Sequence, residues 1–246
     1  MTNQFIHPDW PAPKNIQAIS TTRNGGFSQG PFDSLNLGSH VGDTLSTVLK
    51  NRYSLLEQAS LPEPPRWLNQ VHSSQLISAN DWQGDDSADA IVSSQENQVC
   101  AVMTADCLPI LLCNTQGDHI AAIHAGWRGL SSGILENTLQ QFNCEPSEVI
   151  AWFGPAIGPD KFEVGLDVVE AFTRNSSLAH KAFKQVGESH YLADIYLLAR
   201  QKLIAYGTHA IFGGTHCTAS EPEHFFSYRR DGTTGRMASM IWITHN

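Results

Sequence analysis

Charged residues are scarce in this chain, and basic residues are scarcer than acidic ones. Charged side chains make up 16% of the 246 residues, and 24 Asp and Glu against 15 Lys and Arg give a net charge of −9. Binding to nucleic-acid phosphates needs a basic face, and no run of Lys or Arg supplies one. We therefore expect no nucleic-acid partner.

Long apolar runs are missing as well. No stretch approaches the roughly 18 apolar residues that a membrane-spanning helix needs. The first residues, MTNQFIHPDWPAPKN, lack the basic and then apolar pattern of a secretory signal. We therefore expect no membrane partner and a cytoplasmic location.

Cysteines are few and show no pairing pattern. Five are scattered along the chain, at positions 100, 107, 113, 144 and 217. Their odd number and irregular spacing do not suit a disulfide framework. Free thiols are typical of a reducing compartment, which again favours the cytoplasm.

The apolar residues that are present follow both helical and strand spacings. Helical spacing covers residues 46–59, 131–142, 166–174 and 193–205. Short apolar segments typical of strands cover residues 67–73, 89–93, 99–113 and 119–126, and residues 225–243 predict a β-hairpin around the turn DGTTG. Strands and helices do not alternate regularly, so we predict a single α+β domain, residues 1–246, around an antiparallel or mixed sheet.

Three of the strand-like segments end in side chains that can bind a metal ion. They are His72 in NQVH, Cys107 in TADC and His124 in AAIH. Zinc binds thiolate and imidazole readily, and three protein ligands with an open fourth position are typical of catalytic zinc. A lone His or Cys in an apolar strand is more often a packed core residue. The residues alone therefore leave both interpretations open.

Asp106 precedes Cys107 within the apolar stretch 101–113. A buried carboxylate needs a partner, because burial of an unpaired charge is costly. Side chains alternate along a strand, so we expect Asp106 to point away from Cys107. A backbone N–H, an arginine or a ligand histidine would pair with it there. We favour the last role, in which Asp106 orients a metal-binding histidine, with proton transfer and a purely structural pairing as the alternatives.

Candidate substrate-binding residues lie in loops. After His124, the segment AGWRGLSSG opens a helix, where free backbone N–H groups and Arg128 would favour an anion. The glycine-rich loop 20–43 carries Arg23 and Asn36, and such loops line a site or cover a sheet edge.

Arginines also cluster in FFSYRRDGTTGR near the end of the chain. Arginine binds phosphate and carboxylate groups through two parallel hydrogen bonds. We expect Arg229 to contribute in this way to substrate or phosphate binding. Arg230 and Arg236 are expected at the solvated tip of the predicted hairpin.

Several of these segments together resemble a known family. NQVHS, TADCLPILL, AAIHAGWRGL, GPAIGPDKFEVG and FFSYRRDGTTGRMA are similar, in this order, to the signature segments of the YfiH-type proteins, also called laccase-domain or multicopper polyphenol oxidase-type proteins. The likeness covers almost the whole chain. It departs in one loop, where many members have two cysteines and this chain has Asp160 and Lys161.

The resemblance implies a four-layer α/β/β/α fold and a zinc ion bound by His72, Cys107 and His124. It also implies phosphorolysis of adenosine, inosine and methylthioadenosine, and deamination of adenosine, with purine nucleosides and phosphate as the small-molecule partners. Asp106, Cys107 and His124 would then be catalytic. The candidate substrate-binding residues are Arg23, Asn36, Arg128 and Arg229. A homodimer is a further expectation.

Other functions would use the same side chains of His72, Cys107 and His124. Some members are described as polyphenol oxidases or peptidoglycan editing factors. No two of the 11 histidines are separated by one residue, which argues against a complete multicopper site, although a single copper ion can replace zinc. Cys107 with His124 and an aspartate would form a cysteine hydrolase. A partner-binding protein with a structural zinc is the non-enzymatic alternative, which a fourth protein ligand would favour.

Overall fold

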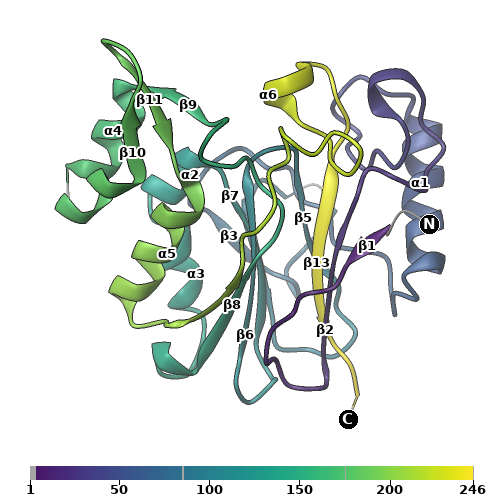
Figure 1. Ribbon diagram of the computed structural model, residues 1–246. Helices are drawn as coiled ribbons and strands as arrows, with labels where there is room; N and C mark the ends of the chain where they lie inside the picture. Colours follow the sequence, from purple (N-terminus) through teal and green to yellow (C-terminus); the bar gives the residue numbers. More distant parts are fainter. Residues whose placement is uncertain (1–3, 85, 175, 246) are drawn as a thin grey trace.

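Two β-sheets pack face to face at the centre of the molecule, with helices outside each of them (Figure 1). The structure is a computed structural model that describes residues 4–84, 86–174 and 176–245. The first sheet has the strand order β1-β2-β13-β5, and all its neighbouring strands are antiparallel. Its strands are β1 (Phe5–Ile6), β2 (Ile16–Thr21), β5 (Cys100–Thr104) and β13 (Met237–Ile243).

The second sheet has the strand order β12-β8-β6-β7-β4-β3 and is mixed. Its central neighbours are antiparallel, whereas the edge pairs β12–β8 and β3–β4 are parallel. Its strands are β3 (Leu76–Ser78), β4 (Ala90–Ser93), β6 (Leu108–Asn114), β7 (Ile120–Ala125), β8 (Val149–Phe153) and β12 (Ala210–Gly213).

Helices form the two outer layers. α1 (Leu45–Gln58) covers the four-stranded sheet, while α3 (Ile134–Leu139), α4 (Leu166–Thr173) and α5 (Ile195–Tyr206) lie on the side of the six-stranded sheet (Figure 1). A small antiparallel sheet of β9 (Glu163–Gly165), β10 (Phe183–Gln185) and β11 (His190–Ala193) joins this helical layer. The predicted α+β class and four-layer α/β/β/α order are confirmed.

The core explains why the central strands are apolar throughout. Every residue of β6 and β7 is buried, because one face of their sheet meets the other sheet and the opposite face meets helices. Leu111 and Val102 belong to the cluster between the sheets, and Ile110 and Leu135 to the cluster beneath the helices. Strands covered on both faces show continuous apolar runs rather than alternation. None of the described helices is long and apolar enough to cross a membrane.

Four predicted elements are wrong or divided. The stretch 99–113 forms two strands, β5 and β6, which belong to different sheets. Residues 225–243 form no hairpin, since a short helix, α6 (Tyr228–Asp231), precedes β13, which inserts between β2 and β5. The helix predicted at 131–142 is interrupted at Gly133, whose φ of 97° separates α2 (Trp127–Ser131) from α3. Residues 67–73 make an isolated bridge at Asn69 instead of a strand.

Candidate metal centre and active site

Cys107 lies where the chain crosses from one sheet to the other. β5 ends at Thr104 and β6 begins at Leu108, so Asp106 and Cys107 occupy the bend between the sheets and not the middle of a strand. Asp106 has a φ of 96°, a backbone conformation that non-glycine residues rarely adopt. The bend places the Cys107 thiol at the edge of the two sheets rather than between them.

His124 is fixed near the end of β7 beside this bend. It lies opposite Pro109 of β6 in the strand register, and its backbone N–H donates to the Asp89 carbonyl at 2.7 Å. Its side chain is only 4% exposed. The prediction that a strand end presents this histidine is therefore confirmed.

His72 comes from a loop and not from a strand end. Its φ is 59°, and the Asp89 carboxylate organises the surrounding backbone. Asp89 accepts from the N–H of His72 at 3.0 Å, and from the N–H and the hydroxyl of Ser73 at 2.6 and 2.8 Å. The loop thus takes its shape from the buried side chain of Asp89, the residue just before β4. Local sequence spacing does not reveal this contact.

The structure brings the three predicted metal ligands together. One potential donor atom each of His72, Cys107 and His124 lies within 4.8 Å of the others. The two imidazole rings are 4.7 Å apart at 72°. Gly126 adjoins the group, where a Cβ would come within 2.8 Å of His72 Nδ1 and 3.2 Å of Cys107 Sγ. A side chain at Gly126 would therefore push the ligands apart.

The electrostatics of the group favour a thiolate. Burial would raise the pKa of the Cys107 thiol, but the neighbouring His124 and His72 lower it to about 6. Burial would lower the pKa of His124, but the Cys107 thiolate and the Asp89 carboxylate raise it to about 9. A deprotonated thiol is the form that binds a metal ion.

Asp89 is the functional residue that sequence reasoning missed. It is fully buried, and its Oδ1 lies 2.7 Å from Nδ1 of His124. Burial would raise the pKa of Asp89, but hydrogen bonds from His124 and Ser73 lower it. Contact with Nδ1 directs Nε2 of His124 toward the other ligands, an arrangement common around metal-binding histidines. Its signal in the sequence is an aspartate at the start of an apolar strand, DAIVS.

Asp106 has a different role from the favoured prediction. Its Oδ1 accepts from the Thr218 hydroxyl at 2.6 Å, and its Oδ2 accepts from the backbone N–H of Arg229 at 2.6 Å. One partner is a backbone N–H, which is one of the three expected kinds. The other is a hydroxyl, and neither is a ligand histidine. The prediction that Asp106 orients a ligand histidine is wrong, because Asp89 makes that contact. Asp106 instead ties the bend to Thr218 and to the first turn of α6.

The donor set suits zinc or copper. One thiolate and two imidazoles are soft to borderline ligands that both metals accept. Within residues 4–84, 86–174 and 176–245, no fourth Cys, His, Asp or Glu joins the group. Three protein ligands leave a coordination position for water or substrate, which is typical of catalytic rather than structural zinc.

Two cavities meet at the candidate metal centre. The first, about 420 Å³, is here called the apolar cavity; much of its wall is formed by Trp127, Ile157, Phe162, Val164, Val168 and Ile195. The second, about 460 Å³, is called the polar cavity; its wall includes His40, Gln70, Thr104, Arg128, Tyr228 and Arg236. His72, Cys107, Arg128 and Tyr228 line both cavities.

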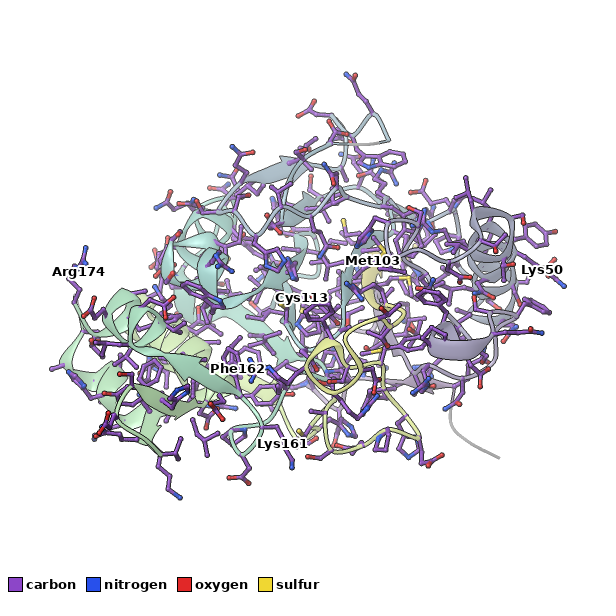
Figure 2. The ribbon with its side chains drawn as sticks, turned by 90° about the horizontal axis from the view of Figure 1, so that it is seen from above. Lys50, Met103, Cys113, Lys161, Phe162 and Arg174 are labelled. Atoms are coloured by element: carbon purple, nitrogen blue, oxygen red, sulfur yellow. The ribbon has the colours of Figure 1, made fainter. Side chains whose placement is uncertain are left out.

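Two of the four predicted substrate-binding residues lie at these cavities. Arg128 lines both of them, with its guanidinium 4.3 Å from the Trp127 ring. Arg229 lines the apolar cavity, and its Nη1 donates to the Lys161 carbonyl at 3.3 Å. Figure 2 shows Lys161 and Phe162 beside the segment of α6. Arg128 follows β7 on α2, which is only five residues long.

Arg23 and Asn36 do not line either cavity. Arg23 donates to the carbonyls of Asp33 and Pro222, at 2.8 and 3.1 Å, and so ties its loop to a distant segment. Asn36 is fully buried, and its Oδ1 accepts from the N–H groups of Gly38 and Arg236. Both side chains shape the loops around the site, and their binding of substrate stays a prediction.

Fold and site together define a four-layer α+β protein with a candidate metal centre between two cavities. The model of the multi-copper polyphenol oxidoreductase laccase family matches residues 17–244. The chain belongs to this family, and the resemblance to YfiH-type proteins is confirmed. The departure at Asp160 and Lys161 lies outside the candidate metal-binding group of His72, Cys107 and His124.

Curated relatives match the chain along nearly its whole length. A purine nucleoside phosphorylase of Haemophilus influenzae is 51% identical over 98% of this chain and 99% of the relative. Purine nucleoside phosphorylase YfiH of Escherichia coli is 52% identical with the same coverage. These relatives are enzymes by name.

Solved structures have the same fold. Protein NMB0706 of Neisseria meningitidis, described as a member of family DUF152, matches with a TM-score of 0.95 and 49% identity, covering 99% of this chain and 100% of that one. YlmD of Geobacillus stearothermophilus matches with a TM-score of 0.90 and 31% identity, covering 100% of this chain and 98% of that one.

Proposed function

We propose that this protein is a purine nucleoside phosphorylase that cleaves adenosine, inosine and methylthioadenosine with phosphate. The observation that carries the proposal is the position of the His72–Cys107–His124 group, where an apolar and a polar cavity meet. One substrate of phosphorolysis has a flat base and the other is an anion. Two adjoining cavities of unlike chemistry suit that pair, and the names of the relatives support the same reaction.

The apolar cavity is the proposed place of the purine. The rings of Trp127 and Phe162 line it, and so does Tyr228, an aromatic side chain that is 61% exposed. Aromatic rings bury large areas and stack against flat groups. The exposed Tyr228 would thus cover the bound base.

The chemical step is a displacement at the ribose. A phosphate oxygen forms a bond with C1′ while the bond from C1′ to the purine breaks, and its electron pair leaves with the purine, which takes up a proton. Arg128 faces both cavities and would hold the phosphate toward C1′ through charge-assisted hydrogen bonds. Zinc held by His72, Cys107 and His124 would supply Lewis-acid chemistry at the junction.

We also propose deamination of adenosine at this site, with zinc as the resident metal and copper as an alternative occupant. The five free cysteines fit a reducing compartment, so we propose a cytoplasmic location. A homodimer stays a prediction that sedimentation of the pure protein would check.

Metal-analysed protein incubated with adenosine, with and without phosphate, tests the proposal. We expect adenine and ribose 1-phosphate only when phosphate is present, and inosine in both cases. Absence of any nucleoside turnover by fully zinc-loaded protein would contradict the proposed function. Product formation without a metal requirement would contradict the metal's role.

A cysteine hydrolase is the second candidate, since Cys107 and His124 form a thiolate–imidazolium pair when no cation is bound. It differs in its response to metal. A hydrolase that uses the thiolate as a nucleophile would be inhibited by zinc and active after chelation, whereas the proposed phosphorylase would lose activity.

A further inference from the structure

Arg236 is held rigidly at the wall of the polar cavity. Its backbone N–H donates to Oδ1 of Asn36 at 2.9 Å, and its Nη1 donates to the carbonyls of Thr234 and Gly235 at 3.1 and 3.0 Å. Its stem passes close to Gly38, where a Cβ would lie 2.8 Å from the Arg236 Cγ. Gly38 therefore leaves room for the Arg236 side chain, and the buried Asn36 fixes the Arg236 backbone.

The Arg236 guanidinium has no carboxylate partner among the described residues. Within that part of the chain, its Nε and Nη2 also donate to no protein acceptor. Burial lowers the pKa of Arg236, as expected for a desolvated charge. The nearby Arg230, by contrast, pairs with Asp231 at 2.7 Å. A partly buried charge without a protein partner is suited to an anionic ligand.

The polar cavity is positive as a whole. Arg128 and Arg236 line it, and no Asp or Glu does. The Cys107 thiolate also lines it, but His124 beside it balances that negative charge. Burial lowers the pKa of His40, and the positive charges of Arg236 and Arg52 lower it further. Arg52 lies behind the wall and donates twice to the Leu37 carbonyl. An anion in this cavity would meet two guanidinium groups and one imidazole.

The apolar cavity has the opposite character. Asp106, Glu163 and Asp167 are among the residues that line it, with Arg229 at the same wall. Three carboxylates would repel a phosphate dianion there. Two arginines line each cavity, so the two cavities differ in charge through the carboxylates, which line only the apolar cavity.

We infer that Arg236, together with His40 and Arg128, forms a binding site for inorganic phosphate in the polar cavity. The inference rests on the proposed function for the identity of the anion. Nη2 and Nε of Arg236 donate to two phosphate oxygens, and His40 and Arg128 contact the remaining ones. Asn36 is a positioning residue in this arrangement, because it acts through the backbone of Arg236.

Titration calorimetry with inorganic phosphate on the zinc-loaded whole chain tests the inference. Arg236→Gln should weaken phosphate binding about 10–100-fold, as expected for loss of a charged two-point contact. Arg236→Lys keeps the charge but not the planar fork, so it should weaken binding about tenfold. His40→Gln should cost several-fold.

Arg174→Gln is the matched control, because Arg174 is exposed after α4 at the far edge of the helical layer (Figure 2). It should leave phosphate binding unchanged. Arg229→Gln is the competing variant. If it weakens phosphate binding while folded Arg236→Lys does not, the anion binds in the apolar cavity and the inference is overturned. Unchanged binding in both Arg236 variants, with normal zinc content and melting temperature, overturns it as well.

Turnover measured in parallel separates this inference from the proposed function. Arg236→Lys should raise KM for phosphate and leave KM for the nucleoside near its original value. If the wild-type protein binds phosphate through Arg236 but cleaves no nucleoside, the proposed function fails and the site stands. If it cleaves nucleosides with the same KM for phosphate in the variant, the function stands and the site fails.

Discussion

Cys107 and Cys113 lie in one short stretch of the chain, and both are largely removed from solvent, yet their thiols differ greatly in acidity. Burial raises the pKa of Cys113 to about 12, whereas His124 and His72 lower the pKa of Cys107 to about 6 despite its burial. Cys113 lies inside β6, between the two sheets. Cys107 lies in the bend before β6. A bend at the sheet edge, where side chains from a loop and another strand can meet it, makes the one cysteine chemically different.

Replacement of the two cysteines should give the largest difference. Cys107→Ser should lower zinc affinity about 10²–10³-fold, since binding energies of about 10–16 kcal/mol are shared among the few ligands of a zinc site. Cys113→Ala should leave metal content unchanged and destabilise the fold by about 1–2 kcal/mol through lost packing. Metal analysis and thermal unfolding of both variants check this. Equal zinc content in Cys107→Ser and the wild type would remove Cys107 from the ligand set.

In metal-stripped protein, Cys107 and Cys113 should also differ in their rates of alkylation. The thiolate is the reactive form, so alkylation of Cys107 by iodoacetamide should rise through a midpoint near pH 6 and level off above it. At neutral pH, Cys107 should react about 10²-fold faster than Cys113, even allowing for the weaker nucleophilicity of an acidic thiol. Peptide mapping after timed labelling measures both rates. A midpoint near the ordinary thiol pKa would contradict the influence of the histidines.

Replacement of the two aspartates near Cys107 should likewise lower zinc affinity at one position and only stability at the other. Asp89→Asn should lower zinc affinity about 10–100-fold, because Asp89 holds His124 and the His72 loop. Asp106→Asn should leave metal affinity unchanged and lower the melting temperature, since its partners are Thr218 and the backbone of Arg229. Zinc titration against a competing chelator distinguishes them. The reverse ranking would restore Asp106 as the residue that orients a ligand histidine.

Gly126→Ala should have the smallest effect. The added Cβ would meet His72 Nδ1 and Cys107 Sγ, but the His72 loop can move by a few tenths of an ångström. We expect a several-fold loss of zinc affinity. Gly117→Ala, at a glycine remote from the site but also crowded, is the control. It should affect stability and not zinc.

Much of this site could be predicted from the sequence. Cys107 and His124 follow apolar runs that do become strands, so their placement at the sheet edge follows from local pattern. The sequence predicts His72 beside Cys107 and His124, and the structure does bring the three together. The predicted strand end is wrong, because the His72 loop is shaped by Asp89 and not by strand geometry. Asp89 itself was missed, since its contacts lie 16–18 residues away on one side and 35 on the other.

Contacts between residues far apart in the sequence also limit how much of the fold can be predicted. The apolar residues 99–113 predict buried strands, but hydrophobicity cannot say that the chain changes sheets at residues 105–107. The hairpin predicted at 225–243 failed because β13 pairs with β2 and β5, which lie far away in the sequence. A hairpin there would place Arg236 at a solvated tip, whereas the long-range pairing of β13 places it at the polar cavity.

The crossing bend has a consequence for how the protein folds. The three ligands come from a loop, a bend between sheets and a strand, so they meet only after both sheets have formed and docked. Contacts of long sequence separation form late, because loop closure must precede them. A metal ion that binds only the completed site cannot speed folding and should instead slow unfolding. Zinc would thus stabilise the native state only after folding is complete. Its removal would shorten the lifetime of the native state and leave the folding rate unchanged.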